Sequence, residues 1–243
     1  MPLRFHVDPP LREGAELSLP PGAARHAQVL RLQPQTEITL FDGSGGEWAA
    51  TIVRMGRSEV AVCIGAHAAV ERELALEVTL ALGMPANERM DTLIEKATEL
   101  GVTTVQPLHC ERSVLRLSGE RALKKVAHWR GVAQAACEQS GRTRVPTIAP
   151  VLSVHEWLAS LTPDDAARQR LLLSPRSAQP LARNDAKAVL CLSGPEGGLT
   201  DAEEQAALDH GFGAVSLGPR VLRADTAPLA LLAHLALCAE GMA

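Results

Sequence analysis

Apolar runs alternate with amphipathic helical stretches from about residue 73 to the end of the chain, and this alternation limits the fold more than any other feature. LEVTLALGM, VTTVQPLHC, RLLLS and AVLCLS have the composition of strands, with TIAPVLS and AVSLG as further candidates. In NERMDTLIEKATELG, one helical face carries Leu93, Ile94, Ala97 and Leu100, and Gly101 is placed to end the helix. Strands that alternate with helices predict a mainly parallel α/β sheet covered by helices.

The first 72 residues have a different pattern of apolar and polar residues. Three short β-type runs, EITLFDG, EWAATIVRM and EVAVCIG, are separated by turn residues and predict a small β-barrel or sandwich. Gly43 and Gly45 have the spacing of a dinucleotide-binding loop, but Trp48 stands where the third glycine belongs and a strand follows, so a hairpin turn is favoured. We therefore predict two domains, 1–72 and 73–243.

Composition indicates a cytoplasmic protein without a metal site. The apolar runs stop well short of the roughly 20 residues that a membrane span needs, and the N-terminus lacks an apolar segment after a basic start. The five cysteines are scattered, with no CxxC pair and no histidines at metal-ligand spacing. We expect reduced, mostly buried thiols, no metal and no membrane association.

The charge distribution is uneven. The net charge is -4, yet residues 111–144 hold eight basic side chains against three acidic ones. Such a segment forms either a positive surface that attracts phosphates or an ordinary solvated helix face, and charge alone does not decide between them.

A glycine-rich loop follows the strand AVLCLS. In SGPEGGLTDAEEQ, residues 193–205, Thr200 and Glu203 form a capping box that fixes the start of a helix, and Gly194, Gly197 and Gly198 allow close approach of a ligand to the backbone. Helix N-termini attract phosphate, but the loop lacks GK[ST] and Glu196 would repel an anion. A nucleoside-like ligand fits better than phosphate, and a turn with no ligand is the alternative.

A second loop, LGPRVLRADTAP at residues 217–228, also follows a strand and precedes a helix. Gly218 and Pro219 force a turn, and Pro228 is tolerated only in the first turn of a helix, which should therefore begin near Thr226. Ligands of open α/β sheets collect where loops leave the carboxyl ends of strands. The two Gly-Pro loops are expected to form one pocket, whose rim carries Arg220, Arg223 and Asp225.

Together these motifs resemble a known family. GPEGGLT and LGPRVLRADTA, with KATELGV, ERS, EQSGRTRVP, RHAQVLRL and FDGSGGEW, are similar to the bacterial small-subunit (16S) ribosomal RNA uridine-N3 methyltransferases, and the similarity covers essentially the whole chain. The chain departs from the usual pattern at Ala224, Asp225 and Pro228.

The resemblance implies a fold and a cofactor. The family belongs to the SPOUT methyltransferases, whose mainly parallel sheet ends in a C-terminal trefoil knot that binds S-adenosylmethionine, and it adds a PUA-like β-barrel that binds RNA and a homodimeric assembly. Carried over to this sequence, the cofactor-binding residues are Leu173, Ser174, Gly194, Pro195, Glu196, Gly197, Gly198, Leu217, Gly218, Leu222 and Arg223.

Roles in catalysis and RNA binding are also expected. Arg223, or else Arg220, would stabilise negative charge on the uracil, and Asp225, Glu196 or water would accept its proton. The alternatives for the two arginines are RNA phosphate binding and structural ion pairing. The favoured alternative for Glu196 is a carboxylate that caps backbone N–H groups of its own glycine loop. RNA contacts are expected from Arg25, His26, Arg31, Arg112, Arg116, Arg142 and Arg144.

Two other functions stay open at this point. One is another SPOUT RNA methyltransferase, acting on a ribose 2′-hydroxyl or a tRNA base. The other is a non-catalytic RNA-binding or ribosome assembly factor, which would have little use for two Gly-Pro loops.

Overall fold

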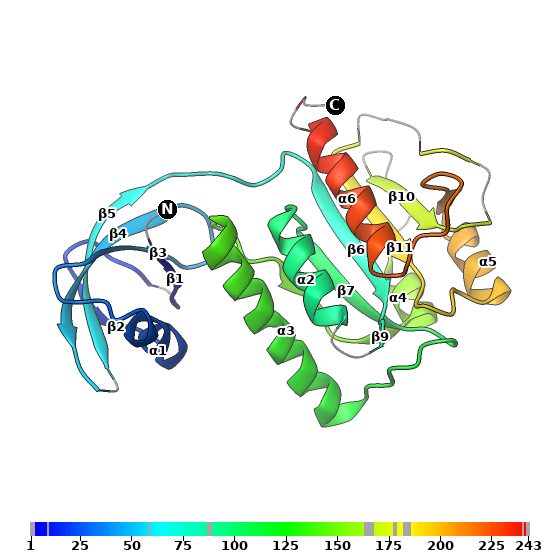
Figure 1. The fold of residues 1–243 in the computed structure, drawn as a ribbon. Coiled ribbons are helices and arrows are strands. Elements are labelled where there is room, and N and C mark those ends of the chain that lie inside the picture. The colour runs from blue at the N-terminus through cyan, green and yellow to red at the C-terminus, as the bar shows by residue number, and fades with distance from the viewer. Residues whose placement is uncertain are drawn as a thin grey trace. The chain divides into compact units, whose positions relative to one another are not determined.

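The computed structural model describes residues 3–8, 10–57, 59–86, 89–162, 168–176, 179–181, 186–239 and 241. The chain forms two compact units. The first contains residues 1–73 and 134–145, and the second contains residues 74–133 and 146–243. Figure 1 labels most of their helices and strands.

The first unit is built on a five-stranded sheet with the order β1-β3-β4-β5-β2. Its strands are β1 (Arg4–His6), β2 (Glu16–Ser18), β3 (Glu37–Phe41), β4 (Glu47–Met55) and β5 (Val60–Ala68). β1 pairs parallel with β3, and the other neighbours pair antiparallel. The three β-type runs of the sequence are β3, β4 and β5, and FDGSGGEW contains the turn between β3 and β4, as predicted.

Helix α1 (Pro21–Val29), which the sequence analysis did not predict, completes the core of the first unit. Ala23, Ala24 and Ala27 are buried and pack in one cluster with strand residues such as Phe5 and Ile52. The helix has a weak sequence signal because its buried face consists of alanines, whose burial contributes little apolar area per residue.

Residues 134–145 belong to the first unit through polar contacts. The backbone N–H of His6 donates to Glu138 Oε1 at 2.9 Å, Arg142 Nε lies 3.0 and 3.1 Å from the two carboxylate oxygens of Glu73, and Arg144 Nε lies 3.1 Å from Glu71 Oε2. A helical sequence pattern does not reveal which domain the end of a helix packs against. The predicted domain boundary after residue 72 therefore assigned this segment to the second domain.

The second unit contains a seven-stranded parallel sheet with the order β12-β10-β11-β6-β7-β8, in which β9 also pairs with β7. The strands are β6 (Glu77–Gly83), β7 (Thr104–His109), β8 (Thr147–Ile148), β9 (Leu152–Ser153), β10 (Arg168–Leu173), β11 (Ala188–Ser193) and β12 (Gly213–Val215). The prediction of a mainly parallel sheet is confirmed. TIAPVLS forms two very short strands, β8 and β9, on either side of Pro150, which has no N–H to donate to the sheet.

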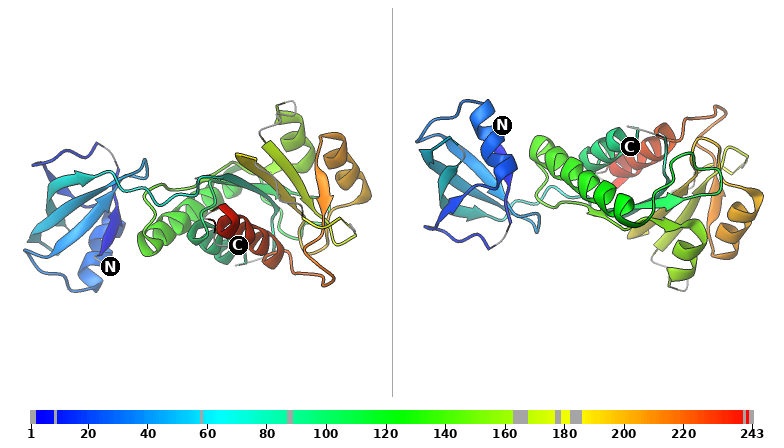
Figure 2. Two further views of the ribbon diagram at one scale, coloured as in Figure 1. Left: turned by 90° about the horizontal axis from the view of Figure 1, so that it is seen from above. Right: turned by 90° about the horizontal axis from the view of Figure 1, so that it is seen from below.

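Helices cover both faces of this sheet, with α2 and α6 on one side and α4 and α5 on the other (Figure 2). The helices are α2 (Arg89–Glu99), α3 (Gly119–Ser140), α4 (Val154–Ser160), α5 (Asp201–Asp209) and α6 (Thr226–Ala239). Helix α6 begins at Thr226 as predicted, and Gly101 adopts a φ of 93° just after α2. No helix among the described residues is long and apolar enough to cross a membrane.

Because the sheet is parallel, β10, β11 and β12 present their carboxyl ends at one edge. The strands end at Leu173, Ser193 and Val215, which are register partners, and the segments that follow them therefore meet there. The predicted trefoil knot depends on the path of residues 177–178 and 182–185, which lie outside the described ranges, so the knot itself stays a prediction.

Candidate active site

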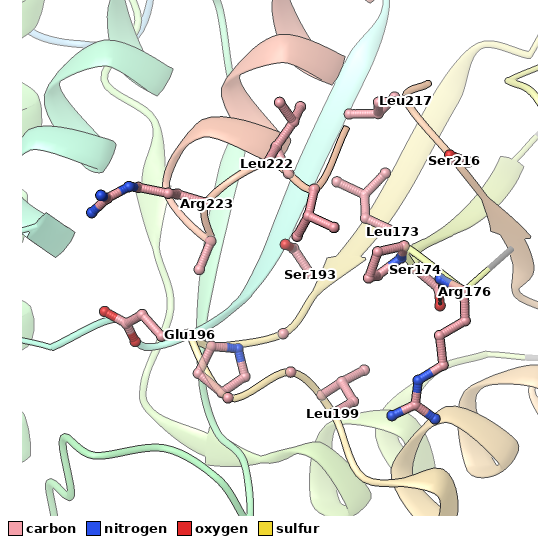
Figure 3. A pocket seen from close by; sticks show the side chains of 18 of the residues that line it. Leu173, Ser174, Arg176, Ser193, Glu196, Leu199, Ser216, Leu217, Leu222 and Arg223 are labelled. Atoms are coloured by element: carbon pink, nitrogen blue, oxygen red, sulfur yellow. Dashed lines mark hydrogen bonds between the residues drawn. The ribbon is translucent and has the colours of Figure 1, made fainter. Parts of the chain in front are cut away.

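One pocket lies at the carboxyl ends of β10, β11 and β12. Its volume is about 510 Å³, within the range of about 300 to 1,000 Å³ that is typical of small-molecule sites. Figure 3 shows Leu173, Leu217 and Leu222 pointing toward one another across the pocket, above Ser193 and the loop that contains Glu196 and Leu199. The two Gly-Pro loops of the sequence thus line the same pocket, as predicted from the order of strands and turns.

The loop after β11 is shaped by glycines. Gly198 has a φ of +69°, a conformation that side chains disfavour. A Cβ at Gly194 would lie 2.9 Å from the backbone nitrogen of Leu199. The positive φ of Gly198 and the close approach of the backbone at Gly194 explain why the loop needs glycine at these two positions even without a ligand.

Helix α5 begins with the predicted capping box. Thr200 Oγ1 accepts from the N–H of Glu203, and Glu203 Oε2 accepts from the N–H of Thr200 at 2.9 Å. Glu203 is buried, and its other oxygen, Oε1, accepts from the N–H of Glu111 at 2.8 Å. The sequence predicted only that Glu203 caps its own helix, but the Glu203 carboxylate also fixes the turn that follows β7.

Glu196 contacts a neighbouring loop. Its Oε1 accepts from the N–H of Ala86 at 3.0 Å and lies 3.6 Å from Arg89 Nη1. The sequence analysis weighed Glu196 as a proton acceptor and as a cofactor-binding residue. The structure shows it bonded to the segment between β6 and α2.

The opposite wall of the pocket comes from the segment between β12 and α6. The carbonyl of Arg223 accepts from the N–H groups of Thr226 and Ala227, each at 3.0 Å, which starts α6. Arg220 and Arg223 are exposed at this wall, and the Arg223 side chain extends away from Ser193 (Figure 3). Asp225 is half-buried in the turn before α6 and is not among the lining residues.

A polar rim between β10 and α5 was not predicted. Ser174 is buried and its Oγ donates to Glu204 Oε1 at 3.4 Å, while Arg176 forms an ion pair with Asp201. The Arg176 guanidinium holds the pKa of Asp201 below its usual value. Glu204 and Arg176 line the pocket, and the only sequence signal for Glu204 was its place in the first turn of a helix that follows a glycine loop.

The structure brings together nearly all the residues predicted to bind the cofactor. Gly218 is the exception: it lines a smaller adjoining cavity, of about 340 Å³, together with Pro219 and Arg220. Other residues line the pocket that the sequence analysis did not assign to the cofactor site or to catalysis: Arg89, Pro175, Arg176, Ser193, Leu199, Glu204, Val215, Ser216, Val221, Ala224 and Ala227.

In the first unit, two of the predicted RNA contacts lie on α1 and one lies just after it. Arg25 and Arg31 are exposed, and Arg31 has a φ of 55°, unusual for a residue with a side chain. The His26 ring packs edge-on against Phe5, and its Nδ1 lies 4.0 Å from Glu138 Oε2.

The other four predicted RNA contacts already have protein partners. Arg142 is buried in its ion pair with Glu73, so its guanidinium is not available to a phosphate, and the prediction for Arg142 is wrong. Arg144 pairs with Glu71 but is half exposed, Arg116 donates to the Glu111 carbonyl, and Arg112 donates to carbonyls of the pocket loop. Each of these four arginines therefore has a protein partner.

Among the described residues, no group of three or more histidine, cysteine or acidic side chains is placed to hold a metal ion. Cys110 and Cys191 are buried, and burial raises the pKa of the Cys110 thiol to about 12, with the nearby Glu203 adding to the shift. Such a thiol is protonated and inert at neutral pH.

Comparison with known proteins agrees with this architecture. A model of the RNA methyltransferase domain matches residues 72–236, and a model of the RNA methyltransferase PUA domain matches residues 19–63. The fold and the pocket are thus those of a two-domain RNA methyltransferase.

Individual relatives narrow the family further. A ribosomal RNA small subunit methyltransferase E of Synechocystis is 35% identical over 86% of this chain and 68% of its own length. The crystal structure of a protein of that name from Neisseria gonorrhoeae, bound to S-adenosyl methionine, is 37% identical with a TM-score of 0.89, covering 97% of this chain and 96% of that one. A Legionella pneumophila methyltransferase in complex with the same cofactor is 31% identical, with a TM-score of 0.88 and 98% of each chain covered. The chain belongs to the ribosomal RNA small subunit methyltransferase E family.

Proposed function

We propose that this protein transfers a methyl group from S-adenosylmethionine to N3 of a uridine in the decoding region of 16S ribosomal RNA. The observation that carries the proposal is the convergence of the two Gly-Pro loops on one pocket in a member of this family. A ribosomal substrate places the enzyme in the cytoplasm.

The pocket has the donors and surfaces that an adenosyl group requires. Leucine side chains supply apolar walls, and the backbone N–H groups of Leu217 and Leu222 have no acceptor among the described residues. An adenine ring needs apolar contact on its faces and hydrogen bonds at its edge. The residues that would hold the cofactor are therefore Leu173, Ser174, the loop from Gly194 to Gly198, Leu217, Leu222 and Arg223.

When bound, S-adenosylmethionine supplies a methyl group activated by its sulfonium. The protein must hold N3 of the uracil about 3 Å from that carbon, which is mostly a positioning task. The target base must leave any stack to reach the pocket. Arg223, exposed at the pocket wall, stabilises the negative charge that develops on the uracil as N3 loses its proton, and Arg220, which lines the same pocket, is the second candidate for this role.

Asp225 is our proposed proton acceptor. Glu196, the other carboxylate considered, already accepts from Ala86 and lies beside Arg89. Asp225 stands two residues after Arg223, in the turn that leads into α6. A carboxylate at this turn would receive the N3 proton next to the arginine that stabilises the resulting charge.

RNA would be bound by exposed basic side chains of the first domain, residues 1–72, namely Arg25, His26 and Arg31, together with Arg116 and Arg144. The sequence has no tyrosine and six other aromatic residues, so phosphate contacts and RNA shape, with few stacked bases, would dominate recognition.

A second copy of the chain is the proposed partner for α6. This helix has no acidic or basic residue other than His234, and Leu237 is 45% exposed. An apolar helix of this kind is stabilised when a partner covers it. Light scattering of the wild type should give the mass of a dimer, and Leu237→Asp should shift it toward the monomer.

Calorimetry and RNA mapping test the function. The purified protein should bind S-adenosylmethionine, and small-subunit RNA from a strain that lacks the gene should lose N3-methyluridine and regain it on complementation. Loss of a ribose methylation instead would show a different RNA methyltransferase. Failure to bind the cofactor at micromolar protein would favour a non-catalytic RNA-binding factor.

A further inference from the structure

Arg112 lies in the turn after β7 and contacts the pocket loop from outside. Its Nη1 donates to the carbonyl oxygens of Gly197, at 3.3 Å, and Leu199, at 3.1 Å. A Cβ on Gly197 would lie 3.0 Å from Cβ of Arg112, so the two segments of the chain also pack closely against each other. One guanidinium therefore binds both carbonyls on either side of residue 198.

The turn that carries Arg112 is itself firmly held. The N–H of Cys110 donates to Ser113 Oγ at 3.1 Å, and Cys110 and Ser113 are both buried. The buried Glu203 accepts from the N–H of Glu111. Because these bonds fix the backbone on both sides of Arg112, its side chain starts from a defined position.

The two carbonyls belong to peptide groups whose N–H ends are also bonded. The N–H of Gly198, in the same peptide as the Gly197 carbonyl, donates to Pro195 O at 2.8 Å. The N–H of Thr200, in the same peptide as the Leu199 carbonyl, donates to Glu203 Oε2 at 2.9 Å. A peptide group is a rigid plane, so a bond at each end determines its orientation.

We propose that Arg112 is a positioning residue for the cofactor loop: with Glu203 it sets the two peptide planes around Gly198 before any ligand binds. This inference rests on the proposed function, because the pocket formed by that loop is the proposed S-adenosylmethionine site. It replaces the expectation that Arg112 contacts RNA phosphates. A loop fixed in advance binds its ligand more tightly because less ordering remains to be done on binding.

Arg116 provides a matched control. It lies in the same segment and carries the same charge, but its Nη2 donates to the Glu111 carbonyl at 3.2 Å, and within the described residues it forms no hydrogen bond or ion pair with residues 194–200. Arg112→Ala and Arg116→Ala therefore remove equal charge, and only the first releases the loop.

Hydrogen exchange of the ligand-free protein gives a readout independent of the cofactor. Arg112→Ala should speed amide exchange within residues 194–200 by about tenfold, the effect of losing roughly one hydrogen bond, while Arg116→Ala should leave it unchanged. Unaltered exchange in the loop of a folded Arg112→Ala protein would overturn the proposal. Thermal unfolding checks that each variant is folded.

Binding and kinetics give a second readout. Arg112→Ala should raise the Kd and KM for S-adenosylmethionine about tenfold and leave kcat at saturating cofactor near the wild-type value. Arg112→Lys keeps the charge but has a shorter side chain without the rigid guanidinium plane, so it should restore little. Full rescue by lysine, together with a weaker salt dependence of RNA binding in Arg112→Ala, would return Arg112 to the RNA contacts. If the wild type fails to bind the cofactor, the proposed function fails, while the exchange result still decides whether Arg112 holds the loop.

Discussion

Pro195 lies directly against Gly83: a Cβ built on Gly83 would come within 2.5 Å of both the nitrogen and Cδ of Pro195. Gly83 is the last residue of β6, and Pro195 belongs to the loop that leaves its neighbour β11. The same imaginary Cβ would also lie 2.9 Å from Cys110 Sγ. The pocket loop therefore rests on β6 at a point where only a hydrogen atom fits.

This contact predicts the effect of Gly83→Ala. The added methyl group must displace the proline and its loop, which should destabilise the protein by about 1–3 kcal/mol and weaken S-adenosylmethionine binding at least tenfold. Calorimetry and chemical denaturation measure the two effects. Gly131→Ala is the control, because a Cβ there would meet no atom within 4 Å and the site is inside helix α3. That variant should gain up to about 1 kcal/mol of stability, and equal cofactor affinity in both variants would contradict the prediction.

Arg223→Ala should affect turnover more than cofactor affinity. The Arg223 side chain extends away from Ser193, whereas its backbone carbonyl holds the start of α6 and remains in the variant. Losing a cation that stabilises charge only in the transition state lowers kcat by about 10²–10³ and changes the Kd for S-adenosylmethionine little. Single-turnover methylation and calorimetry separate the two quantities. A large rise in Kd with kcat unchanged would reassign Arg223 to cofactor binding.

Arg31 occupies a position that glycine would fill at lower cost. The N–H of Arg31 donates to Gln28 O at 2.9 Å and that of Leu32 donates to Ala27 O at 3.1 Å, which closes α1 with Arg31 in the left-handed region. Glycine is the usual residue there. Arg31→Gly should therefore raise the free energy of unfolding by about 0.5–1 kcal/mol while weakening RNA binding and reducing its salt slope by about one. A variant that is more stable and binds RNA equally well would remove Arg31 from the RNA contacts.

Glu138→Gln should change how the stability of the first unit depends on pH. Burial raises the pKa of Glu138, although the N–H of His6 and the positive charges of His26, His6 and Arg4 oppose the shift. A raised pKa means that the folded state holds its proton more tightly than the unfolded chain, so the wild type loses stability as pH rises above the usual glutamate value. The Tm of Glu138→Gln relative to wild type should therefore increase from pH 4 to pH 7. A decrease would show that the neighbouring positive charges outweigh burial.

Local patterns determined much of this protein. The apolar runs became β3, β4, β5, β6, β7, β10 and β11, and the helix starts at Thr226 and after Thr200 followed from proline and from a capping box. Such features are readable because hydrophobic period, proline and caps act within a few residues of one another. The order of strand, glycine loop and helix was also sufficient to predict that the two Gly-Pro loops line one pocket.

Tertiary structure decided which partner each polar side chain has. Arg112 and Arg142 look alike in sequence, yet one holds the pocket loop and the other is buried against Glu73. Residues 134–145 joined the first unit, and Arg176 and Glu204 reached the pocket from separate elements. These pairings connect positions 25 to 87 residues apart, as in Arg176 with Asp201 and Arg112 with Leu199. At such separations along the sequence, a charged side chain has many possible partners. Only the folded backbone determines which of them lies within reach.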